Sequence, residues 1–282
     1  MSSQELVQKA IGLIIEEEIP TKDITSEVLI PSNMAGRAKI IAGEDCLLCG
    51  GEVAAMIYMR TDQSLEATIS INDGTSVKQG DVVMNLNGRV RSIMAAKDIV
   101  CAFYGRLSGI AQEAEKYVKA LEGVDSKVVD TRLTAPGMRM LDKYAAYAGG
   151  SLTNPPSLSA AFTITKNHIL ALKAKQKTVA EAIKECRAFS TSPIKVYIEV
   201  WDTPSAKEAI EGKPDYIIFK DMLDLQEIAA IQSSLPSSIQ SQYSGPVSLE
   251  TIREIAEATK VNEIAVPQIT SEFTACRFYL TF

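Results

Sequence analysis

The chain has 282 residues, 46% of them hydrophobic and 23% charged, and its formal net charge is −6. This length accommodates one large core or two domains, and the acidic balance argues against a nucleic-acid-binding protein. Because the sequence has no apolar run of about 18 residues, we expect no membrane-spanning segment. An odd number of cysteines, five in all, and the lack of a secretory pattern at the first residues favour a reducing cytoplasm.

The first part of the chain mixes helical and strand-like patterns. Apolar residues at helical spacing predict helices over 4–18, 52–60 and 95–121. Residues 36–49 are typical of a strand, a turn and a second strand. Residues 65–93 alternate apolar and polar side chains between glycine-containing turns, so we expect β-hairpins there.

The second part alternates short strand-like runs with helical segments. Strands are expected at Lys127–Val129, Phe162–Ile164, Val196–Val200, Tyr216–Phe219, Ile239–Tyr243 and Glu263–Val266. Helices are expected at 178–188, 204–211, 224–234 and 248–258. Such alternation predicts a parallel sheet. Its repetition favours an α/β barrel of six or seven strands, with the chemistry at their carboxyl ends.

Two short motifs have alternative interpretations. Cys46 and Cys49 form a C-x-x-C, but a zinc site needs two more ligands and the sole histidine, His168, is distant in sequence. We therefore expect two buried thiols that act as small apolar residues. The hairpin region up to Lys97 resembles a biotinyl or lipoyl carrier. Because Lys97 is expected at a helix start rather than a hairpin tip, a carrier role is disfavoured.

Residues 128–168 carry the most informative pattern. Its motifs are Asp130-Thr131-Arg132, Pro136-Gly137-Met138-Arg139, Gly149-Gly150 and Asn167-His168. In order and spacing they resemble the central block of the quinolinate phosphoribosyltransferase family, also called nicotinate-nucleotide pyrophosphorylase (carboxylating). The resemblance extends from Asp23 to about Thr270.

The resemblance implies a fold and a reaction. The fold would be an N-terminal α/β sandwich domain over 1–112 and an incomplete (β/α) barrel over 113–268, with 269–282 packing back on the first domain. The reaction joins a pyridine-type base, nominally quinolinate, to phosphoribosyl pyrophosphate with Mg²⁺, and gives nicotinate mononucleotide for NAD biosynthesis. The family also implies a homodimer, with Lys97 or Asp98 near the neighbour's barrel mouth.

Carried over residue by residue, the resemblance gives a set of candidate site residues. Catalytic roles fall on Arg132, Lys166, Glu199 and Asp221. Substrate-binding roles fall on Asp130, Thr131, Arg139, Asn154, His168, Lys220, Ser244 and Gly245. No residue is assigned to a metal site. Mg²⁺ with pyrophosphate would need carboxylates or water, because the ion keeps its hydration shell.

The positions that bind the base in the family depart from its pattern. Leu133 replaces the lysine after Arg132, and Asn154-Pro155 replaces a His-Arg pair. The arginine that crosses the family's dimer interface falls on Asp98, and the lysine before Asn167-His168 falls on Thr165 or, with a deletion, on Lys166. Each charged hydrogen bond is worth about 1.5–3 kcal/mol. These losses therefore predict weak quinolinate binding and an altered substrate.

The phosphate-binding positions depart as well. The family's S-G-G loop is Ser244-Gly245-Pro246 here, and its later V-G pair is Val266-Pro267. Proline has no backbone N–H, so each change removes a potential donor to phosphate. Lys220-Asp221 stands where the family has Asp-Asn, and Glu199 lies within one residue of the expected glutamate.

Several alternatives stay open at this point. The chain is an enzyme acting on quinolinate, a divergent enzyme acting on a different, less anionic base or phosphosugar, or a silent homologue that serves as a binding or partner subunit. Asp130 and Arg132 suit a strand-end ion pair as well as a site, and Arg139 suits helix packing. His168 suits local backbone capping as well as catalysis.

Overall fold

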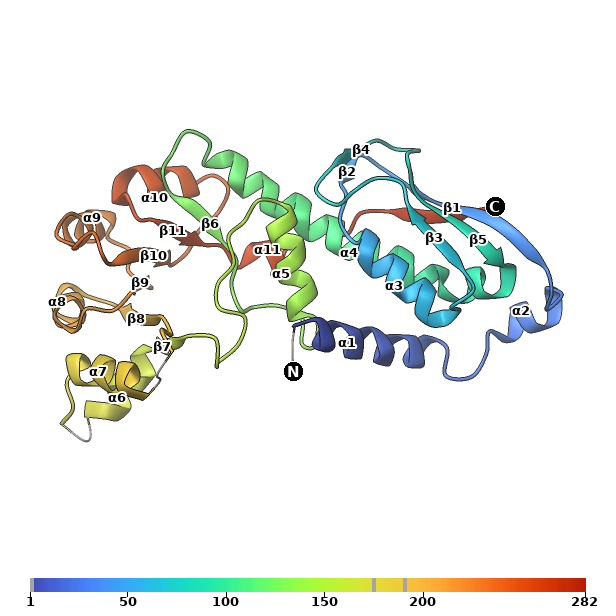
Figure 1. Cartoon of the computed structure of the whole chain (residues 1–282). Helices are drawn as coiled ribbons and strands as arrows, with labels where there is room; N and C mark the ends of the chain where they lie inside the picture. The colour runs from blue at the N-terminus through green and yellow to red at the C-terminus, as the bar shows by residue number, and fades with distance from the viewer. Residues whose placement is uncertain (1–2, 174–175, 190–191) are drawn as a thin grey trace. The chain divides into compact units, whose positions relative to one another are not determined.

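The computed structural model describes residues 3–173, 176–189 and 192–282, which form two compact units (Figure 1). The first unit comprises Met1–Glu115, Leu133–Gly150 and Gln268–Phe282. The second comprises Lys116–Arg132 and Ser151–Pro267. The continuous span expected for the barrel, 113–268, is therefore interrupted, because 133–150 packs within the first unit.

The first unit is built on an antiparallel sheet in the order β12-β1-β5-β3. Its strands are β1 (Ala35–Ala42), β3 (Glu66–Ile69), β5 (Val82–Arg89) and β12 (Phe278–Thr281). The C-terminal strand β12 pairs with β1, placing Lys39 opposite Thr281. A separate ladder joins β2 (Cys46–Leu47) to β4 (Ser76–Val77). The expectation of successive hairpins over 65–93 is therefore corrected, since β3 pairs with β5 while β4 pairs with β2.

Helices complete the first unit. They are α1 (Ser3–Glu18), α2 (Ile24–Leu29), α3 (Gly51–Thr61), α4 (Val90–Ala120), α5 (Arg139–Ala148) and α11 (Gln268–Ser271). Helix α3 packs on β3, and the ring of Tyr104 in α4 stacks on Phe278 of β12 with centroids 5.0 Å apart. Helix α4 begins at Val90 rather than 95, because Val90 and Ile93 extend its buried face towards the strand.

Segment 133–150 is held in the first unit by two specific contacts. A Cβ at Gly149, after α5, would lie 2.1 Å from the backbone oxygen of Ala111 in α4. Only glycine permits that approach. The guanidinium of Arg106 in α4 also binds both carboxylate oxygens of Asp142 in α5, at 2.9 and 2.8 Å.

The second unit contains a parallel sheet in the order β6-β11-β10-β9-β8-β7. The strands are β6 (Lys127–Val129), β7 (Phe162–Ile164), β8 (Val196–Val200), β9 (Tyr216–Lys220), β10 (Gln240–Ser244) and β11 (Glu263–Ala265). Strands β8 and β9 are mostly apolar because parallel strands are buried on both faces, whereas β10 carries polar side chains at most of its positions. The predicted two-part α/β organisation is confirmed, and each predicted strand lies within one residue of its observed position.

The helices of the second unit follow the strands. They are α6 (Lys166–Lys173), α7 (Val179–Phe189), α8 (Thr203–Gly212), α9 (Leu225–Ser233) and α10 (Ile252–Thr259). Asp202 and Ser205 form a capping box at α8, and the Asp224 carboxylate accepts from two backbone N–H groups at the start of α9. Helix α6 was not predicted, because it is short and mostly exposed.

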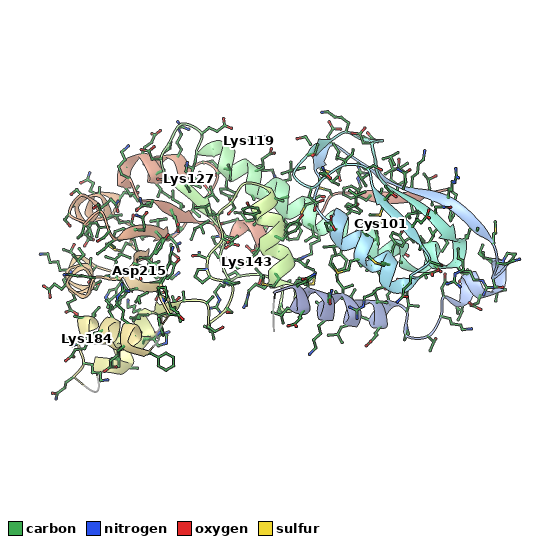
Figure 2. All side chains as sticks on the ribbon, in the orientation of Figure 1. Cys101, Lys119, Lys127, Lys143, Lys184 and Asp215 are labelled. Atoms are coloured by element: carbon green, nitrogen blue, oxygen red, sulfur yellow. The ribbon has the colours of Figure 1, made fainter. Side chains whose placement is uncertain are left out.

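The amino ends of the strands are tied by side chains. The Asp215 carboxylate, just before β9, accepts from the Val196 N–H of β8 at 2.7 Å (Figure 2). The Asn262 side chain accepts from the Ser241 N–H of β10 at 2.8 Å. Such bonds fix one end of the sheet. Within the described ranges, no helix is both long and apolar enough to cross a bilayer.

Candidate functional site

Parallel strands bring their carboxyl ends to one edge of a sheet, where loops carry polar side chains. In the second unit these side chains lie in the last residues of β8, β9 and β10 or just after β6 to β9. They are Asp130, Thr131, Arg132, Lys166, Glu199, Trp201, Lys220, Asp221 and Ser244. The strand ends therefore gather the predicted residues of this unit, together with one aromatic residue that the sequence did not suggest.

Asp130 directly follows β6 and is fully buried. Its carboxylate accepts from the Asn154 N–H at 2.8 Å, and its backbone oxygen accepts from the Asn154 Nδ2 at 2.7 Å. The Asn154 Oδ1 in turn accepts from Gln242 Nε2 at 3.1 Å. Both the nitrogen and the oxygen of the Asn154 side-chain amide are thus hydrogen-bonded within the protein. The family pattern has a cationic pair at this position.

A polar network continues from Asn154 along the sheet. Gln242 in β10 is 3% exposed, and its Nε2 also donates to Glu263 in β11 at 2.9 Å. The hydroxyl of Tyr216 donates to the same Glu263 at 3.3 Å, and its ring stacks on Tyr197 at 4.4 Å. Burial, with a contribution from Glu263, raises the pKa of Tyr216. The phenol therefore stays protonated and orients the carboxylate.

Arg132 lies two residues after Asp130 and is exposed. Within the described ranges its guanidinium makes no hydrogen bond or ion pair. Thr131, between Asp130 and Arg132, is half-buried. The strand-end ion pair considered from the sequence does not form between Arg132 and Asp130. An unpaired guanidinium at a strand end is available to an anionic ligand.

Lys166 begins α6 just after β7. Its backbone N–H donates to the Glu199 carboxylate at 2.8 Å, so Glu199 fixes the lysine's main chain rather than its ammonium. The Lys166 Nζ lies 5.0 Å from the centroid of the Trp201 ring, which follows β8. The cation is therefore held against an aromatic face.

His168 lies one turn into α6 and is exposed. Its Nδ1 accepts from the Thr165 N–H at 3.1 Å and lies 2.7 Å from the Thr165 hydroxyl. These contacts fasten the start of the helix. Asn167 is also exposed. The geometry gives His168 a local capping role, one of the two roles considered from the sequence.

Lys220 and Asp221 end β9. The Lys220 ammonium lies 3.5 Å from the Asp221 carboxylate and 3.5 Å from the Ser244 hydroxyl. Asp221 has a positive φ of 55°, and its side chain is 75% exposed. Gly245 follows β10, where a Cβ would lie 2.5 Å from the Tyr243 hydroxyl. Lys220 is thus shared with a carboxylate, while Asp221 faces solvent.

Arg139 belongs to the first unit and starts α5. Its Nε donates to the Thr134 hydroxyl at 3.4 Å, a weak bond within the same segment. The side chain is half-buried. This bond lies next to the turn that Pro136 and Gly137 form.

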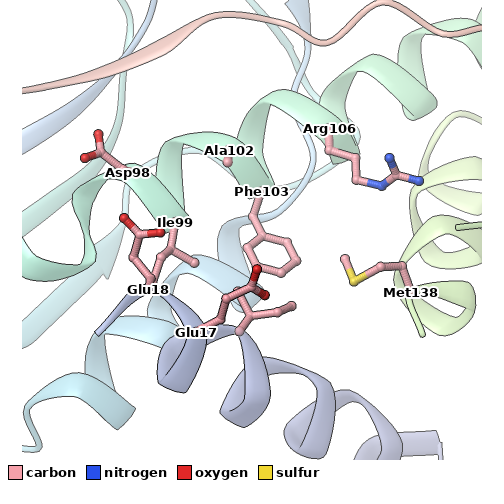
Figure 3. A pocket seen from close by; sticks show the side chains of 9 residues that line it. Glu17, Glu18, Asp98, Ile99, Ala102, Phe103, Arg106 and Met138 are labelled. Atoms are coloured by element: carbon pink, nitrogen blue, oxygen red, sulfur yellow. The ribbon is translucent and has the colours of Figure 1, made fainter. Parts of the chain in front are cut away.

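The first unit holds a cavity of about 430 Å³ between α1 and α4. Figure 3 shows Glu17 and Glu18 from α1 near Asp98 and Phe103 of α4, with Arg106 at the other end. Asp98 accepts from the Lys97 ammonium at 2.6 Å. Both residues lie inside a helix, so Lys97 is not at a hairpin tip where a carrier domain would bear its cofactor.

The two cysteines of the C-x-x-C motif are buried. The pKa of Cys46 is raised by contact with the Cys276 thiol and by burial, and burial raises the pKa of Cys49. Protonated thiols are poor metal ligands. Over the described residues, no group of three or more His, Cys, Asp or Glu side chains suits a metal ion.

Sequence reasoning missed Trp201 and Gln242. Trp201 is the sole tryptophan and directly follows a predicted strand, which was a usable signal. Gln242 lies inside a strand, and its role depends on contacts with residues far away in sequence, so no local pattern identifies it. Both matter because they fix the side chains around Lys166 and Asn154.

Two family models match the chain. The C-terminal domain of quinolinate phosphoribosyl transferase matches residues 110–281, and the N-terminal domain matches residues 23–108. A probable nicotinate-nucleotide pyrophosphorylase (carboxylating) from Archaeoglobus fulgidus is 31% identical, with 93% of this chain and 95% of that protein covered. A protein of the same description from Bacillus subtilis is 27% identical, with 94% and 89% covered.

Solved structures show the same likeness. The nicotinate-nucleotide pyrophosphorylase from Francisella tularensis aligns with a TM-score of 0.89 and 27% identity, covering 100% of this chain and 97% of that one. Both sequence models and this structural agreement span the two units described above. The chain therefore belongs to the quinolinate phosphoribosyltransferase family.

Proposed function

We propose that the chain is a phosphoribosyltransferase that joins phosphoribosyl pyrophosphate to a pyridine-type base carrying less negative charge than quinolinate. Family membership supports the reaction class. The main support for a base other than quinolinate comes from the contacts of Asn154. Its amide is bound to Asp130 and Gln242, at the position where the family has a cationic pair.

The charges at the strand ends support a less anionic base. Lys220 lies 3.5 Å from Asp221, and Lys166 begins beside Glu199. A dicarboxylate moved from water into such a site loses hydration that only paired donors offset. Arg132 is the guanidinium best placed to bind one carboxylate in a bidentate manner.

In the proposed reaction, the ring nitrogen of the base bonds to ribose C1. The bond from C1 to the pyrophosphate oxygen breaks, and its electron pair leaves with pyrophosphate. Arg132, Lys166 and Lys220 would bind the anionic groups of the two substrates. The carboxylates of Glu199 and Asp221 would stabilise the positive charge that develops on the ribose.

Magnesium fits this arrangement as a companion of pyrophosphate. Mg²⁺ keeps several waters and binds proteins through one or two carboxylates plus substrate phosphates. The exposed Asp221 carboxylate suits that role, and Glu199 is a second candidate, with its carboxylate already bound to the Lys166 N–H. When bound, the ion would neutralise charge on the leaving pyrophosphate.

We also propose that the protein is cytoplasmic and forms a homodimer, and that the second domain of each chain is an α/β barrel. The five cysteines are free thiols, as suits a reducing compartment. The dimer would bring α4, with Lys97 and Asp98, near the neighbour's strand ends. Sedimentation at micromolar concentration should give a dimer, and a monomer would contradict this part of the proposal. On the described residues, nothing favours the alternative of a silent binding subunit.

Product formation from a panel of bases tests the function. Purified protein with Mg²⁺ and phosphoribosyl pyrophosphate is given quinolinate, nicotinate or nicotinamide, and nucleotide and pyrophosphate are measured. We expect kcat/KM for nicotinate or nicotinamide to exceed that for quinolinate by about tenfold or more, the loss of one charged contact. Quinolinate turnover near one per second that Arg132→Ala abolishes would overturn the change of base.

A further inference from the structure

The chain's only tryptophan lies at the carboxyl end of the parallel sheet, beside the ammonium of Lys166. Trp201 follows β8 and is half-buried. The Lys166 Nζ lies 5.0 Å from its ring centroid. Within the described ranges, the Lys166 ammonium makes no salt bridge. The aromatic face is thus its observed support.

The two halves of Lys166 are held by different neighbours. Glu199 accepts from the backbone N–H at 2.8 Å, which fixes the main chain at the start of α6. The Trp201 ring then limits where the flexible side chain places its charge. A ring attracts a cation through its electron-rich face without accepting a conventional hydrogen bond from each N–H. The ammonium therefore keeps its donors for a ligand.

We propose that Trp201 is a positioning residue, which holds the Lys166 ammonium at the strand ends to bind a phosphoryl group of the phosphoribosyl donor. This inference rests on the proposed function. A phosphoryl group is the fitting ligand because a compact ammonium binds phosphate as a point charge. Without the phosphoribosyl donor, the Lys166 ammonium lies against the Trp201 ring. Binding of the phosphoribosyl donor should therefore change the surroundings of the indole.

A single tryptophan makes this change measurable. The wild-type chain is titrated with phosphoribosyl pyrophosphate and Mg²⁺ while tryptophan emission is recorded. Inorganic pyrophosphate and ribose 5-phosphate, titrated separately, distinguish which phosphoryl group contacts Lys166. We expect a saturable emission change with the donor and with one of the two fragments. Donor binding by calorimetry without any emission change would contradict the proposal.

Variants separate positioning from simple packing. Lys166→Gln should weaken donor binding about tenfold, the loss of one charge-assisted bond. Trp201→Leu should weaken it about threefold or more, and Trp201→Phe less, because phenylalanine retains a weaker aromatic face. In the double variant Lys166→Gln/Trp201→Leu, binding should be no weaker than in Lys166→Gln, since the ring acts through the lysine. Additive losses would overturn the positioning role.

Lys195 provides a matched control. Its ammonium lies 5.2 Å from the Tyr216 ring centroid, at the amino end of β8. Lys195→Gln removes the same kind of pair from the opposite end of the strand, so donor affinity should stay within about twofold. An equal loss in both glutamine variants would contradict the proposal. Melting curves check that each variant folds. Failure of every probe to bind would overturn the proposed function as well, whereas binding that Lys166→Gln leaves intact overturns this inference alone.

Discussion

Two buried aspartates, one in each unit, are held in different ways. Asp142 in the first unit is fully buried and binds the Arg106 guanidinium through both oxygens, at 2.9 and 2.8 Å. Asp130 in the second unit is equally buried, and its bonds with Asn154 come from neutral donors. The first is an ion pair between two helices. The second includes the bonds from the backbone and side-chain amides of Asn154, which we call the amide lock.

The difference distinguishes a contact that packs two helices from contacts at the proposed substrate site. The ion pair between Asp142 and Arg106 fixes the packing of α4 against α5. The Arg106 guanidinium is then not available to a ligand. After β6 the amides of Asn154 bind Asp130, and Arg132 makes no ion pair with any of the described residues. The comparison therefore predicts that disrupting Asp142 mainly affects stability, whereas changes around Asp130 affect stability and substrate preference together.

The largest effect is expected from Arg106→Met. This change leaves the Asp142 carboxylate buried without its cation, which costs about 3–5 kcal/mol of unfolding free energy. Urea denaturation followed by circular dichroism measures the loss. Lys78→Ala removes an ion pair that is exposed on both sides, so its denaturation midpoint should not change.

A second variant tests the physical reason. Arg106→Met/Asp142→Asn removes both charges and keeps an acceptor for the Ala135 N–H, which now donates to Asp142 at 3.0 Å. The double variant should therefore be more stable than Arg106→Met alone. If it is equally unstable, the loss comes from the packing of Arg106 on Phe273 rather than from the uncompensated charge.

A smaller loss is expected from Asn154→Ala. The Asp130 backbone oxygen and a Gln242 N–H each lose a partner, while the backbone N–H of residue 154 remains, so the cost is about 1–3 kcal/mol. Asn167→Ala removes an exposed amide from the same motif block and should cost less than about 0.5 kcal/mol. Equal midpoints for the two variants would show that the amide lock contributes nothing.

The sequence predicted the second unit more closely than the first. Strands such as Tyr216–Lys220 are mostly apolar runs, so they are visible from their own residues. The pairing of β3 with β5, around β4, depends on contacts distant in sequence, and the alternation over 65–93 fits hairpins equally well. Residues 133–150 were assigned to the barrel because no local signal shows that Gly149 packs on Ala111.

The site was predicted as a set of positions, and the contacts that give each position its role were not. Asp130 and Arg132 share one motif, yet Asp130 is buried and Arg132 is exposed. The sequence could not show that His168 bonds to Thr165, because a capping contact and a catalytic histidine share the same pattern. These distinctions depend on side-chain direction, which follows from packing.

A cation introduced next to Asn154 tests whether the base binds near this residue. Pro155→Arg adds a guanidinium at the position where the family has one, beside the half-buried Asn154. The ratio of kcat/KM for quinolinate to that for nicotinate should rise about tenfold, equivalent to about 1.4 kcal/mol. Leu158→Arg, on the same segment but 82% exposed, should leave the ratio unchanged. Equal ratios for both variants would mean that the base does not bind beside residue 155.

Asp62 is a third buried aspartate, and its contribution to the free energy of unfolding should depend on pH. Its carboxylate, 3% exposed, accepts from Arg89 at 2.8 Å and Ser92 at 2.6 Å. The Arg89 bond, with the serine bonds, holds the pKa of Asp62 well below its usual range despite burial. The unfolded chain, whose aspartates titrate near pH ~3.9, therefore binds this proton first as pH falls. Stability from Asp62 is complete above that pKa and is lost progressively below it.

Asp62→Asn should therefore have the smallest effect at pH 7. The amide still accepts hydrogen bonds, and Arg89 is largely exposed, so we expect a loss of about 1 kcal/mol. Between about pH 5 and pH 2 the gap between wild type and Asp62→Asn should narrow, because only wild type loses the carboxylate's contribution. Urea midpoints at several pH values measure this gap. A gap that stays constant down to pH 2 would show that the Asp62 carboxylate is not preferentially ionised in the folded protein.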